Sequence, residues 1–339
     1  MIPVYRPTIR RVDMDAVLTR LASDSIGPGD ISREFSQTIA KRVGRRSGNA
    51  GRSTGWVFRA ALAALDLESG ARVGVSILAP RAIHAAVKAE GLTAVPIDVQ
   101  KRVPILPSPL NYDYEELRLS ALVVDTRLGY IPDLESFSQV GIPIIEEITD
   151  GFGGNRATTT VGSIGELVVL GLEPEGVITT GGGAVILTNN MRRVGTINGY
   201  LDAHTGEPPL PDMNAALGLT QLKQLDRFIE RRREIAGHFI RTLQRSAHGV
   251  VLQGEEVDNV FPSLPVQVET SPREVEKYAR THGVATIRAF SGADLSEGDP
   301  TREFPNGFAF LARTVLFPLY PSLSKAELSQ IERVLATLP

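Results

Sequence analysis

The chain has 339 residues, of which 42% are apolar and 22% charged, a composition typical of a soluble globular protein of about two domains. Its 36 Lys and Arg residues against 39 Asp and Glu residues give a net charge of −3, which argues against nucleic acid as a partner because that affinity depends on a basic excess. The absence of Cys excludes disulfides and thiolate chemistry, and it makes a reducing cytoplasm the expected location.

Short apolar runs in the first two thirds of the chain have the composition of β-strands. Most are continuous rather than alternating, which is typical of strands covered on both faces of a parallel sheet. Helical patterns lie between them, including Gly55 to Leu67 and Pro80 to Glu90. This alternation predicts βαβ units and a mostly parallel sheet. The predicted strands are Val73–Leu78, Ala94–Ile97, Ala121–Asp125, Pro143–Ile145, Leu167–Leu170 and Ala184–Thr188.

The stretch from Asp212 to Gln244 has few breakers and is predicted to form one or two helices that lead out of the first domain. We expect Asp212 to cap the first of them and the charged run Glu230–Glu234 to face water. The polar Gly/Pro-rich segment Asn198–Pro211 is predicted to be a loop. No apolar run approaches the ~20 residues that a membrane helix needs, so we expect no membrane partner.

The last part of the chain is predicted to be a small α/β domain over residues 246–339, after a large domain over residues 1–245. Two helix starts in it have the capping-box pattern, in which a Ser side chain and a Glu three residues later bind each other's backbone N–H groups. These pairs are Ser271 with Glu274 and Ser324 with Glu327.

Three searches for local motifs find no chemistry. The five His residues have no metal-ligand spacing, so we expect no metal site. The segment Gly162–Gly165 is not a nucleophile elbow, because Val161 stands where the first Gly is required. The run Thr179–Gly183 lacks the Gly-Lys-Ser/Thr ending of a phosphate-binding loop and is predicted to be a turn before the last strand.

Several segments taken together resemble the DegT/DnrJ/EryC1/StrS sugar aminotransferases. The strongest are ITTGGGAVILTNN (Ile178–Asn190), IPIIEE (Ile142–Glu147) and PDMNAALGLTQLKQLDRFIERRREIA (Pro211–Ala236). The opening IPVYRPTI, GPGDISREFSQTIAKRVG (Gly27–Gly44) and LFPLYPSLSKAELSQIERVL (Leu316–Leu335) also fit in the same order. The resemblance therefore covers almost the whole chain.

The resemblance implies the α/β architecture of fold-type-I aminotransferases, with a large, mostly parallel seven-stranded sheet and a small C-terminal α/β domain. It also implies a dimer with active sites at the subunit boundary. The family moves an amino group from glutamate to a keto-sugar nucleotide with pyridoxal phosphate (PLP), which forms a Schiff base with a Lys of the enzyme.

The resemblance places this Lys at Gly176 of the present chain. A dehydratase branch of the family has His there, which still acts as a base, but Gly offers neither an imine nor a base. The chain's other lysines, Lys41, Lys88, Lys101, Lys223, Lys277 and Lys325, all fall in helices or loops away from this turn. We therefore expect no catalytic residue of the family's kind.

The positions that hold the cofactor's ring also differ from the family. The Asp that pairs with the pyridine nitrogen corresponds to Glu147, one methylene longer, and the Gln three residues later corresponds to Asp150. The aromatic residue that stacks on the ring corresponds to Pro80, which offers no π face. Glu147 follows a parallel strand, where such sheets bind ligands, so a functional role for it is favoured.

The phosphate grip is altered as well. The family uses Ser-Gly-Thr at a helix N-terminus, where free N–H groups favour an anion, and here the order is Ser53-Thr54-Gly55. A second phosphate contact, a Ser, corresponds to Gly171. Ser53 is expected to cap the helix and is compatible with a remnant anion site. The following Trp56 either fills the vacated space or, as we favour, makes ordinary helix-packing contacts.

Charges near this pocket have two interpretations. Acidic residues at 147, 150, 173 and 175 would gather there and disfavour an anion. Arg52, Arg59 and Arg81 are either solvated surface residues or a replacement anion site. The run by which the partner subunit reaches the site aligns with Glu207-Pro208-Pro209.

The sequence therefore predicts a degenerate family member that has lost transamination and needs no cofactor. It would bind a sugar nucleotide or another anionic small molecule, or dimerise with itself or with an active homologue, in nucleotide-sugar or polysaccharide biosynthesis. One alternative is an atypical aminotransferase or dehydratase that binds PLP or pyridoxamine phosphate (PMP) non-covalently. Another is a PLP-independent enzyme that uses Glu147 and Asp150 for acid–base chemistry.

Overall fold

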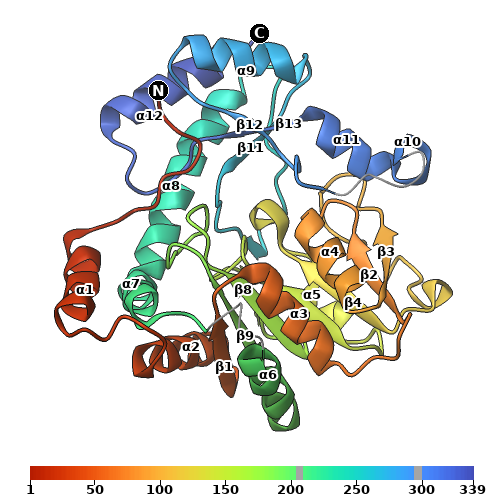
Figure 1. The fold of residues 1–339 in the computed structure, drawn as a ribbon. Helices are drawn as coiled ribbons and strands as arrows, with labels where there is room; N and C mark the ends of the chain where they lie inside the picture. Colours follow the sequence, from red (N-terminus) through yellow and green to blue (C-terminus); the bar gives the residue numbers. More distant parts are fainter. Residues whose placement is uncertain (204–208, 294–299) are drawn as a thin grey trace.

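The computed structural model describes residues 1–203, 209–293 and 300–339 (Figure 1). Its largest element is a seven-stranded sheet of order β1-β9-β8-β5-β4-β2-β3, in which only β9 runs antiparallel to its neighbours. This sheet confirms the predicted architecture. Its strands are β1 (Ser47–Gly51), β2 (Arg72–Ser76), β3 (Thr93–Ile97), β4 (Ala121–Asp125), β5 (Ile144–Glu147), β8 (Leu167–Gly171) and β9 (Ala184–Thr188).

Two smaller sheets complete the strands of the described residues. One has the order β10-β6-β7 and the other β11-β13-β12. Their strands are β6 (Asn155–Arg156), β7 (Thr159–Thr160), β10 (Val257–Asp258), β11 (Leu264–Gln267), β12 (Ile287–Arg288) and β13 (Thr314–Phe317).

Helices cover both faces of the large sheet. The helices of the described residues, including those of the C-terminal part, are α1 (Arg11–Ala22), α2 (Asp30–Arg42), α3 (Thr54–Ala64), α4 (Arg81–Ala89), α5 (Leu134–Phe137), α6 (Met191–Ala203), α7 (Asp212–Leu222), α8 (Leu225–Leu243), α9 (Pro272–Thr281), α10 (Pro300–Glu303), α11 (Pro305–Arg313) and α12 (Lys325–Ala336), with 3₁₀ turns η1 (Glu115–Leu117) and η2 (Arg127–Gly129). Among the described residues, none of these helices is both long and apolar enough to cross a membrane.

The strands of the large sheet are apolar on both faces, which explains why helices cover both faces. Along β8, Leu167 and Val169 pack under α3, α4 and α6, while Val168 and Leu170 pack against α2, α7 and the start of α8. Because successive side chains of a strand point to opposite faces, both faces of such a strand need a helical cover. Figure 1 shows the sheet between these two sets of helices.

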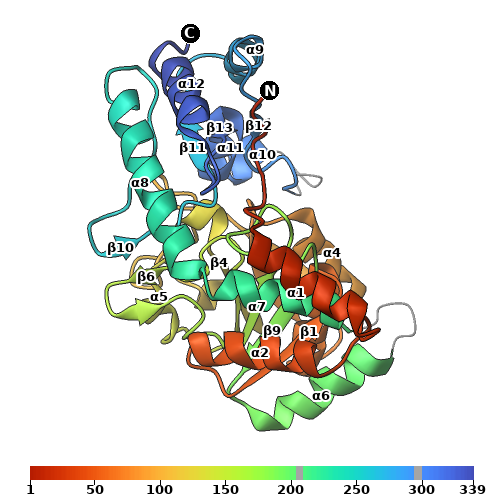
Figure 2. The same ribbon diagram turned by 90° about the vertical axis from the view of Figure 1, so that its left-hand side faces the viewer.

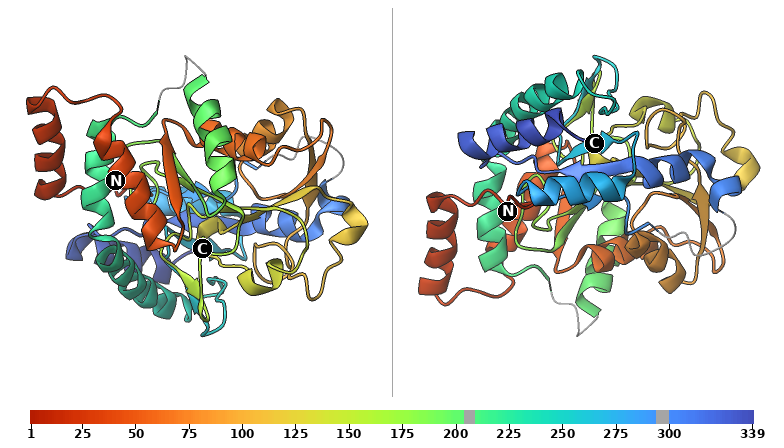
Figure 3. Two further views of the ribbon diagram at one scale, coloured as in Figure 1. Left: turned by 90° about the horizontal axis from the view of Figure 1, so that it is seen from below. Right: turned by 90° about the horizontal axis from the view of Figure 1, so that it is seen from above.

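The C-terminal part forms a second unit above the sheet in Figure 1. Its core joins β11 and β13 to α9, α12 and the second half of α8, and it includes Ile2 from the start of the chain. Figure 2 shows the N-terminal segment running from this unit down to α1, and in Figure 3 α1 stands at the side of the body. The domain boundary between residues 245 and 246 falls just after α8 and stays a prediction.

Strand β1 is absent from our sequence-based assignment. Its sequence, Ser-Gly-Asn-Ala-Gly, has none of the residues that favour strands. A Cβ at Gly48 would lie 2.3 Å from the backbone oxygen of Ser36 on α2. Gly is therefore needed at position 48, where the backbones of α2 and β1 approach each other closely. No pattern in the neighbouring sequence indicates this contact.

Asp212 does not cap its own helix, contrary to expectation. Pro211 is the N-cap residue of α7 and makes no side-chain capping bond. The buried carboxylate of Asp212 instead accepts a hydrogen bond from the backbone N–H of Ser32, 2.8 Å away, in the first turn of α2. It satisfies a free donor of another helix, as a capping side chain would.

Of the two predicted capping boxes, the one at Ser324 and Glu327 is confirmed, with reciprocal bonds of 3.2 and 2.8 Å. The one at Ser271 is wrong, because the Ser271 side chain makes no capping bond. The N–H of Glu274 is instead satisfied by the backbone oxygen of Ser271 at 2.9 Å.

Two further expectations are wrong. Within Glu230–Glu234, Arg232 is 4% exposed and donates to the carbonyl oxygens of Pro262 and Leu319, so it ties α8 to the C-terminal unit. The predicted loop from Asn198 begins as helix, because α6 continues to Ala203, and the next five positions lie outside the described residues.

The predicted turn at Thr179–Gly183 is confirmed, with positive φ at its three glycines.

Candidate functional site

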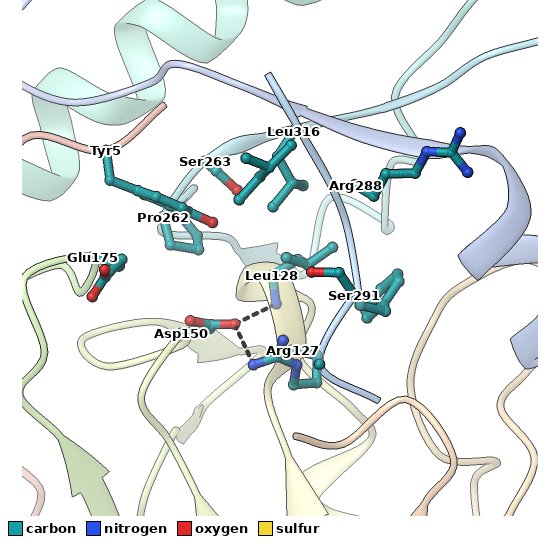
Figure 4. A pocket seen from close by; sticks show the side chains of 13 residues that line it. Tyr5, Arg127, Leu128, Asp150, Glu175, Pro262, Ser263, Arg288, Ser291 and Leu316 are labelled. Carbon is teal, nitrogen blue, oxygen red and sulfur yellow. Dashed lines mark hydrogen bonds and ion pairs between the residues drawn. The ribbon is translucent and has the colours of Figure 1, made fainter. Parts of the chain in front are cut away.

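The carboxyl ends of β4, β5 and β8 meet the C-terminal unit around a polar cavity of about 190 Å³ (Figure 4). This edge of a parallel sheet is where ligands usually bind. The walls come from four places: the loops after β4 and β5, the turn after β8, the N-terminal segment, and the C-terminal unit. The lining residues are Tyr5, Arg127, Leu128, Asp150, Glu175, Pro262, Ser263, Ile287, Arg288, Phe290, Ser291, Gly292 and Leu316.

Asp150 is fixed on one wall of the cavity by two contacts. Its Oδ2 accepts from the backbone N–H of Leu128 at 2.8 Å and lies 3.3 Å from Nη1 of Arg127. Both side chains of this ion pair are about four-fifths buried. The predicted site residue Asp150 therefore lies at the cavity, with its charge balanced by an arginine.

Two buried carboxyl groups end the strands that lead to this edge of the sheet. Asp125 ends β4 and pairs in register with Glu147 at the end of β5. Asp125 is 1% exposed and its carboxyl oxygens have no hydrogen-bond partner among the described residues. Burial raises the pKa of Asp125 to about 6 although Arg127 opposes the rise. The two carboxyls therefore resist being charged together.

Glu147 is 4% exposed and accepts hydrogen bonds from the backbone N–H of Thr149, at 3.1 Å, and from the Thr149 hydroxyl. Burial raises the pKa of Glu147 to about 7, with Thr149 opposing the rise and Asp150 adding to it. The carboxyl group is thus turned into its own loop, where it is partly protonated near neutral pH.

Gly171 lies where the hydroxyls of Thr149 and Thr54 converge. A Cβ at this position would lie 2.9 Å from Oγ1 of Thr149 and 3.1 Å from Oγ1 of Thr54. The backbone N–H of Gly171 donates to Oγ1 of Thr149 at 2.8 Å. A side chain at position 171 would therefore have to displace the hydroxyls of Thr149 and Thr54.

Thr54, the first residue of α3, holds a carboxylate of the chain itself. Its hydroxyl donates to Oε1 of Glu173 at 3.2 Å, and Oε2 of Glu173 lies 3.3 Å from the Cβ position of Gly182. An anion is favoured at a helix N-terminus by free N–H groups and the helix dipole. The Glu173 carboxylate, bonded to the Thr54 hydroxyl, places a negative charge of the chain itself beside this helix end.

Gly176 lies in the turn after β8, and this turn is closed around it. A Cβ at Gly176 would lie 2.8 Å from the backbone oxygen of Ile178 and 3.3 Å from that of Glu173. The N–H of Gly176 donates to the Glu173 oxygen at 3.0 Å. The surroundings of Gly176 are backbone, and neither Trp56 nor Pro80 is among them.

Ser53 and Trp56 have the structural roles that we expected. Oγ of Ser53 accepts from the N–H of Trp56 at 3.3 Å and caps α3. The ring of Trp56 packs on Tyr200 of α6 with 4.6 Å between ring centroids. Trp56 therefore packs against the neighbouring helix α6. Gly55 lies in the first turn of α3 with open space around its Cβ position.

Pro80 is the N-cap residue of α4 and forms an isolated β-bridge with Ala293. The N–H of Arg81 donates to the oxygen of Gly292 at 2.6 Å, so the C-terminal unit covers this end of α4. Arg59 does not form an open anion site, because its Nε lies 2.6 Å from Oε1 of Glu90. Glu207 and Pro208 of the predicted partner contact lie outside the described residues, and Pro209 bridges Gly51.

The predicted acidic residues are gathered in part. Asp150 and Glu175 line one cavity, Glu147 ends β5 and is not part of the lining, and Glu173 is bonded to Thr54 of α3. Sequence reasoning missed Asp125, Arg127 and Tyr5. Asp125 ends a predicted strand, which is the same signal that identified Glu147, whereas Tyr5 reaches the cavity from the N-terminal segment and has no local signal.

Comparison with known proteins gives consistent matches. The profile of the DegT/DnrJ/EryC1/StrS aminotransferase family matches residues 7–338. The spore coat polysaccharide biosynthesis protein SpsC of Bacillus subtilis is 23% identical and covers 97% of this chain and 95% of its own. The dTDP-4-dehydro-2,3,6-trideoxy-D-glucose 4-aminotransferase of Saccharopolyspora spinosa is 24% identical over 98% and 95% of the two chains.

Solved structures show the same fold. The aminotransferase TlmJ from Streptoalloteichus hindustanus superposes with a TM-score of 0.90 at 18% identity, over 99% of this chain and 98% of that one. DesV of S. venezuelae, solved in complex with a ketimine intermediate, gives 0.85 at 20% identity over 97% and 96% of the two chains. At these identities the likeness establishes the fold.

Proposed function

The chain belongs to the DegT/DnrJ/EryC1/StrS aminotransferase family, and we propose that it has lost PLP-dependent amino transfer. It acts as a ligand-binding or partner protein in nucleotide-sugar or polysaccharide biosynthesis, as a homodimer or paired with an active homologue. The observation that carries this proposal is the Glu173 carboxylate on Thr54, at the helix end where the family binds the cofactor's phosphate. Two anions at one helix end repel each other, so the internal carboxylate opposes the phosphate.

Gly176 is the second support. A Schiff base needs an amine at this position, and Gly has no side chain. A Cβ at this position would lie 2.8 Å from the Ile178 oxygen, so the backbone would have to shift to accept any side chain. A single engineered exchange of Lys for Gly would leave the rest of the grip in place, and here Gly171 and Thr54 are altered as well.

Glu147 is the third support. A ring nitrogen stays protonated beside a carboxylate that is charged and faces it. Glu147 is bonded to Thr149 in its own loop, and burial raises its pKa to about 7. The residues present do not fit PLP at the amine, the phosphate or the ring nitrogen, so we derive no step that uses it.

The relatives support the biosynthetic setting. SpsC is a spore coat polysaccharide biosynthesis protein, and another relative, from Escherichia coli O157:H7, is a GDP-perosamine synthase that is 24% identical over 83% of this chain. Both names concern carbohydrate biosynthesis, and both proteins are similar to this chain over most of its length. A role in carbohydrate biosynthesis is therefore the simplest proposal for this chain.

A second candidate function is a PLP-independent enzyme that uses its carboxyl groups as acid and base. The observation that favours it is the registered pair of Asp125 and Glu147, whose pKa values burial raises to about 6 and about 7. Groups that titrate near neutral pH suit proton transfer. This candidate predicts an activity that Glu147→Gln or Asp150→Asn abolishes.

The test of the proposed function is an amino-transfer assay. Purified protein is incubated with PLP, glutamate and a 4-dehydro nucleotide sugar, and 2-oxoglutarate is measured, with an active family member as the positive control. We expect no 2-oxoglutarate above the background without protein. Turnover that depends on both protein and PLP would overturn the proposal, and it would equally establish the alternative of non-covalent cofactor binding.

A further inference from the structure

Arg127 lies at the sheet edge near two carboxyl groups but is bonded to only one of them. Its Nη1 lies 3.3 Å from Oδ2 of Asp150 (Figure 4), while its Nε is buried without a hydrogen-bond partner among the described residues. Asp125, two residues earlier, is 1% exposed, and neither of its carboxyl oxygens has a partner within the described ranges. Buried polar atoms are nearly always paired, so this donor and this carboxyl indicate a contact that the present conformation does not make.

A proton on Asp125 explains why the contact is not made. Burial raises the pKa of Asp125 to about 6, while Arg127 acts against the rise and Asp150 adds to it. A neutral carboxyl group attracts a guanidinium only weakly, so Arg127 is left to the charged Asp150. When Asp125 loses its proton, it becomes a buried charge, and a buried charge without a partner is costly.

Arg127 is the cation that a charged Asp125 would meet. The nearest other groups are acids: Glu147, in register from β5, and Asp150 in the loop after β5. Arg288 of the C-terminal unit is held in an ion pair of 3.3 Å with α9, and Figure 4 shows it turned away from Asp150. Among the described residues, the ionisable side chains on the elements packed around Asp125 and Arg127 are Tyr5, His84, Glu147, Asp150, Glu175 and Arg288.

Asp150 also holds a strained turn, so the position of Arg127 matters beyond the ion pair. Leu128, in the 3₁₀ turn η2, has a left-handed backbone conformation with φ 55° and ψ 21°, which is costly for a residue other than Gly. Its N–H donates, at 2.8 Å, to the same Oδ2 of Asp150 that binds Arg127. The carboxylate therefore clamps the turn and the guanidinium together.

The turn η2 leads directly into the contacts between the large sheet and the C-terminal unit. The hydroxyl of Tyr130 donates to the oxygen of Val251 at 3.0 Å. The N–H of Ile131 donates to Oε1 of Gln253 at 2.8 Å, and the Gln253 amide donates back to the Ile131 oxygen at 2.7 Å. A change at the clamp thus occurs next to the boundary between the two units.

We infer that Asp125 and Arg127 form a pH-sensitive switch: when Asp125 loses its proton, the guanidinium of Arg127 moves from Asp150 to Asp125. The Nε–H of Arg127 then donates to Asp125, Asp150 becomes an unbalanced carboxylate on the cavity wall, and the clamp on Leu128 weakens. This inference goes beyond the proposed function and does not depend on the loss of amino transfer, because it concerns only contacts within the chain.

The test follows the Nε–H signal of Arg127 by ¹H–¹⁵N NMR from pH 5 to pH 8, with the signal assigned by its loss in Arg127→Lys. We expect the wild-type signal to shift with a midpoint near pH 6. Asp125→Asn keeps the shape but cannot be charged, so its signal should show no such midpoint. Asp150→Asn removes the competing carboxylate and should lower the midpoint by about one pH unit.

The matched control is Asp66→Asn, an exposed carboxylate beyond the C-terminal end of α3, which should titrate like the wild type. A wild-type signal that stays constant over this range would overturn the inference. An equal midpoint in Asp125→Asn would assign the titration to Glu147 and would overturn it as well.

Crystal structures of the wild type at pH 5 and pH 8 provide a second measurement that needs no variant. We expect Arg127 to be bonded to Asp150 at pH 5 and to Asp125 at pH 8. The same pairing at both pH values would refute the switch.

Discussion

Removal of the Glu173 carboxylate is the most direct perturbation of the altered phosphate grip. In Glu173→Ala, Thr54 loses an acceptor at 3.2 Å and α3 loses the negative charge at its N-terminus. A hydrogen bond to a charged group contributes about 1.5–3 kcal/mol when buried, and a charge at a helix N-terminus about 0.3–1 kcal/mol. Because Glu173 is half-exposed, the loss in the free energy of unfolding should be near 1 kcal/mol.

The same change should open the helix end to an external anion. We expect inorganic phosphate to raise the thermal midpoint of Glu173→Ala more than that of the wild type, with chloride at equal ionic strength as the reference. Phosphate at ten times its dissociation constant would stabilise the variant by about 1.4 kcal/mol. Glu173→Gln keeps the size and an acceptor, so it separates charge from packing.

The control for this prediction is Glu68→Ala, an exposed carboxylate beyond the C-terminal end of α3, which should respond to phosphate like the wild type. Equal stabilisation of the wild type and of Glu173→Ala by phosphate would show that Glu173 does not compete for the helix end. An unchanged unfolding free energy of Glu173→Ala would show that the contact with Thr54 contributes nothing in solution.

Four further predictions concern folding. Gly176→Lys should lower stability by about 1–3 kcal/mol, because its Cβ meets the Ile178 oxygen at 2.8 Å, and should give no Schiff-base band with PLP; a band would refute this. Because burial raises the pKa of Glu147 to about 7, the folded state binds its proton more tightly than the unfolded state, and stability should fall as pH rises from about 4.5 to about 7. In Glu147→Gln the thermal midpoint should depend less on pH over this range, and an unchanged slope would contradict the prediction. Arg232→Met should cost about 3 kcal/mol in urea unfolding, because buried carbonyls lose their donor, and a loss below about 1 kcal/mol would refute this role. Ser324→Ala should cost about 1 kcal/mol through its capping bond, against no change for Ser271→Ala, and equal losses would contradict the assignment.

Much of the fold could be predicted because burial acts on short stretches of sequence. The strands Ala121–Asp125 and Ala184–Thr188 begin and end where their apolar runs do, since every residue in them is buried. Strand β1 could not be predicted in this way, because Gly48 is required by the close approach of the α2 backbone and not by a local sequence preference. Asp212 likewise binds the N–H of Ser32, far away in sequence.

The site was predictable where a strand leads into it. Glu147 ends β5, and the rule that parallel strands carry ligands at their carboxyl ends singled it out, while the family resemblance pointed to Asp150, which lines the cavity. The same rule applied to β4 would have found Asp125. Tyr5 and Ser291 come from segments that meet the sheet edge only after both units have folded, so no pattern around them indicates the cavity.

The loss of cofactor chemistry is the central claim, and spectroscopic titration of the purified protein with PLP and PMP tests it most directly. We predict absorbance spectra that equal the sum of the free components, with no shift in thermal midpoint. A saturable band at micromolar concentrations, together with a rise in thermal midpoint, would contradict the account.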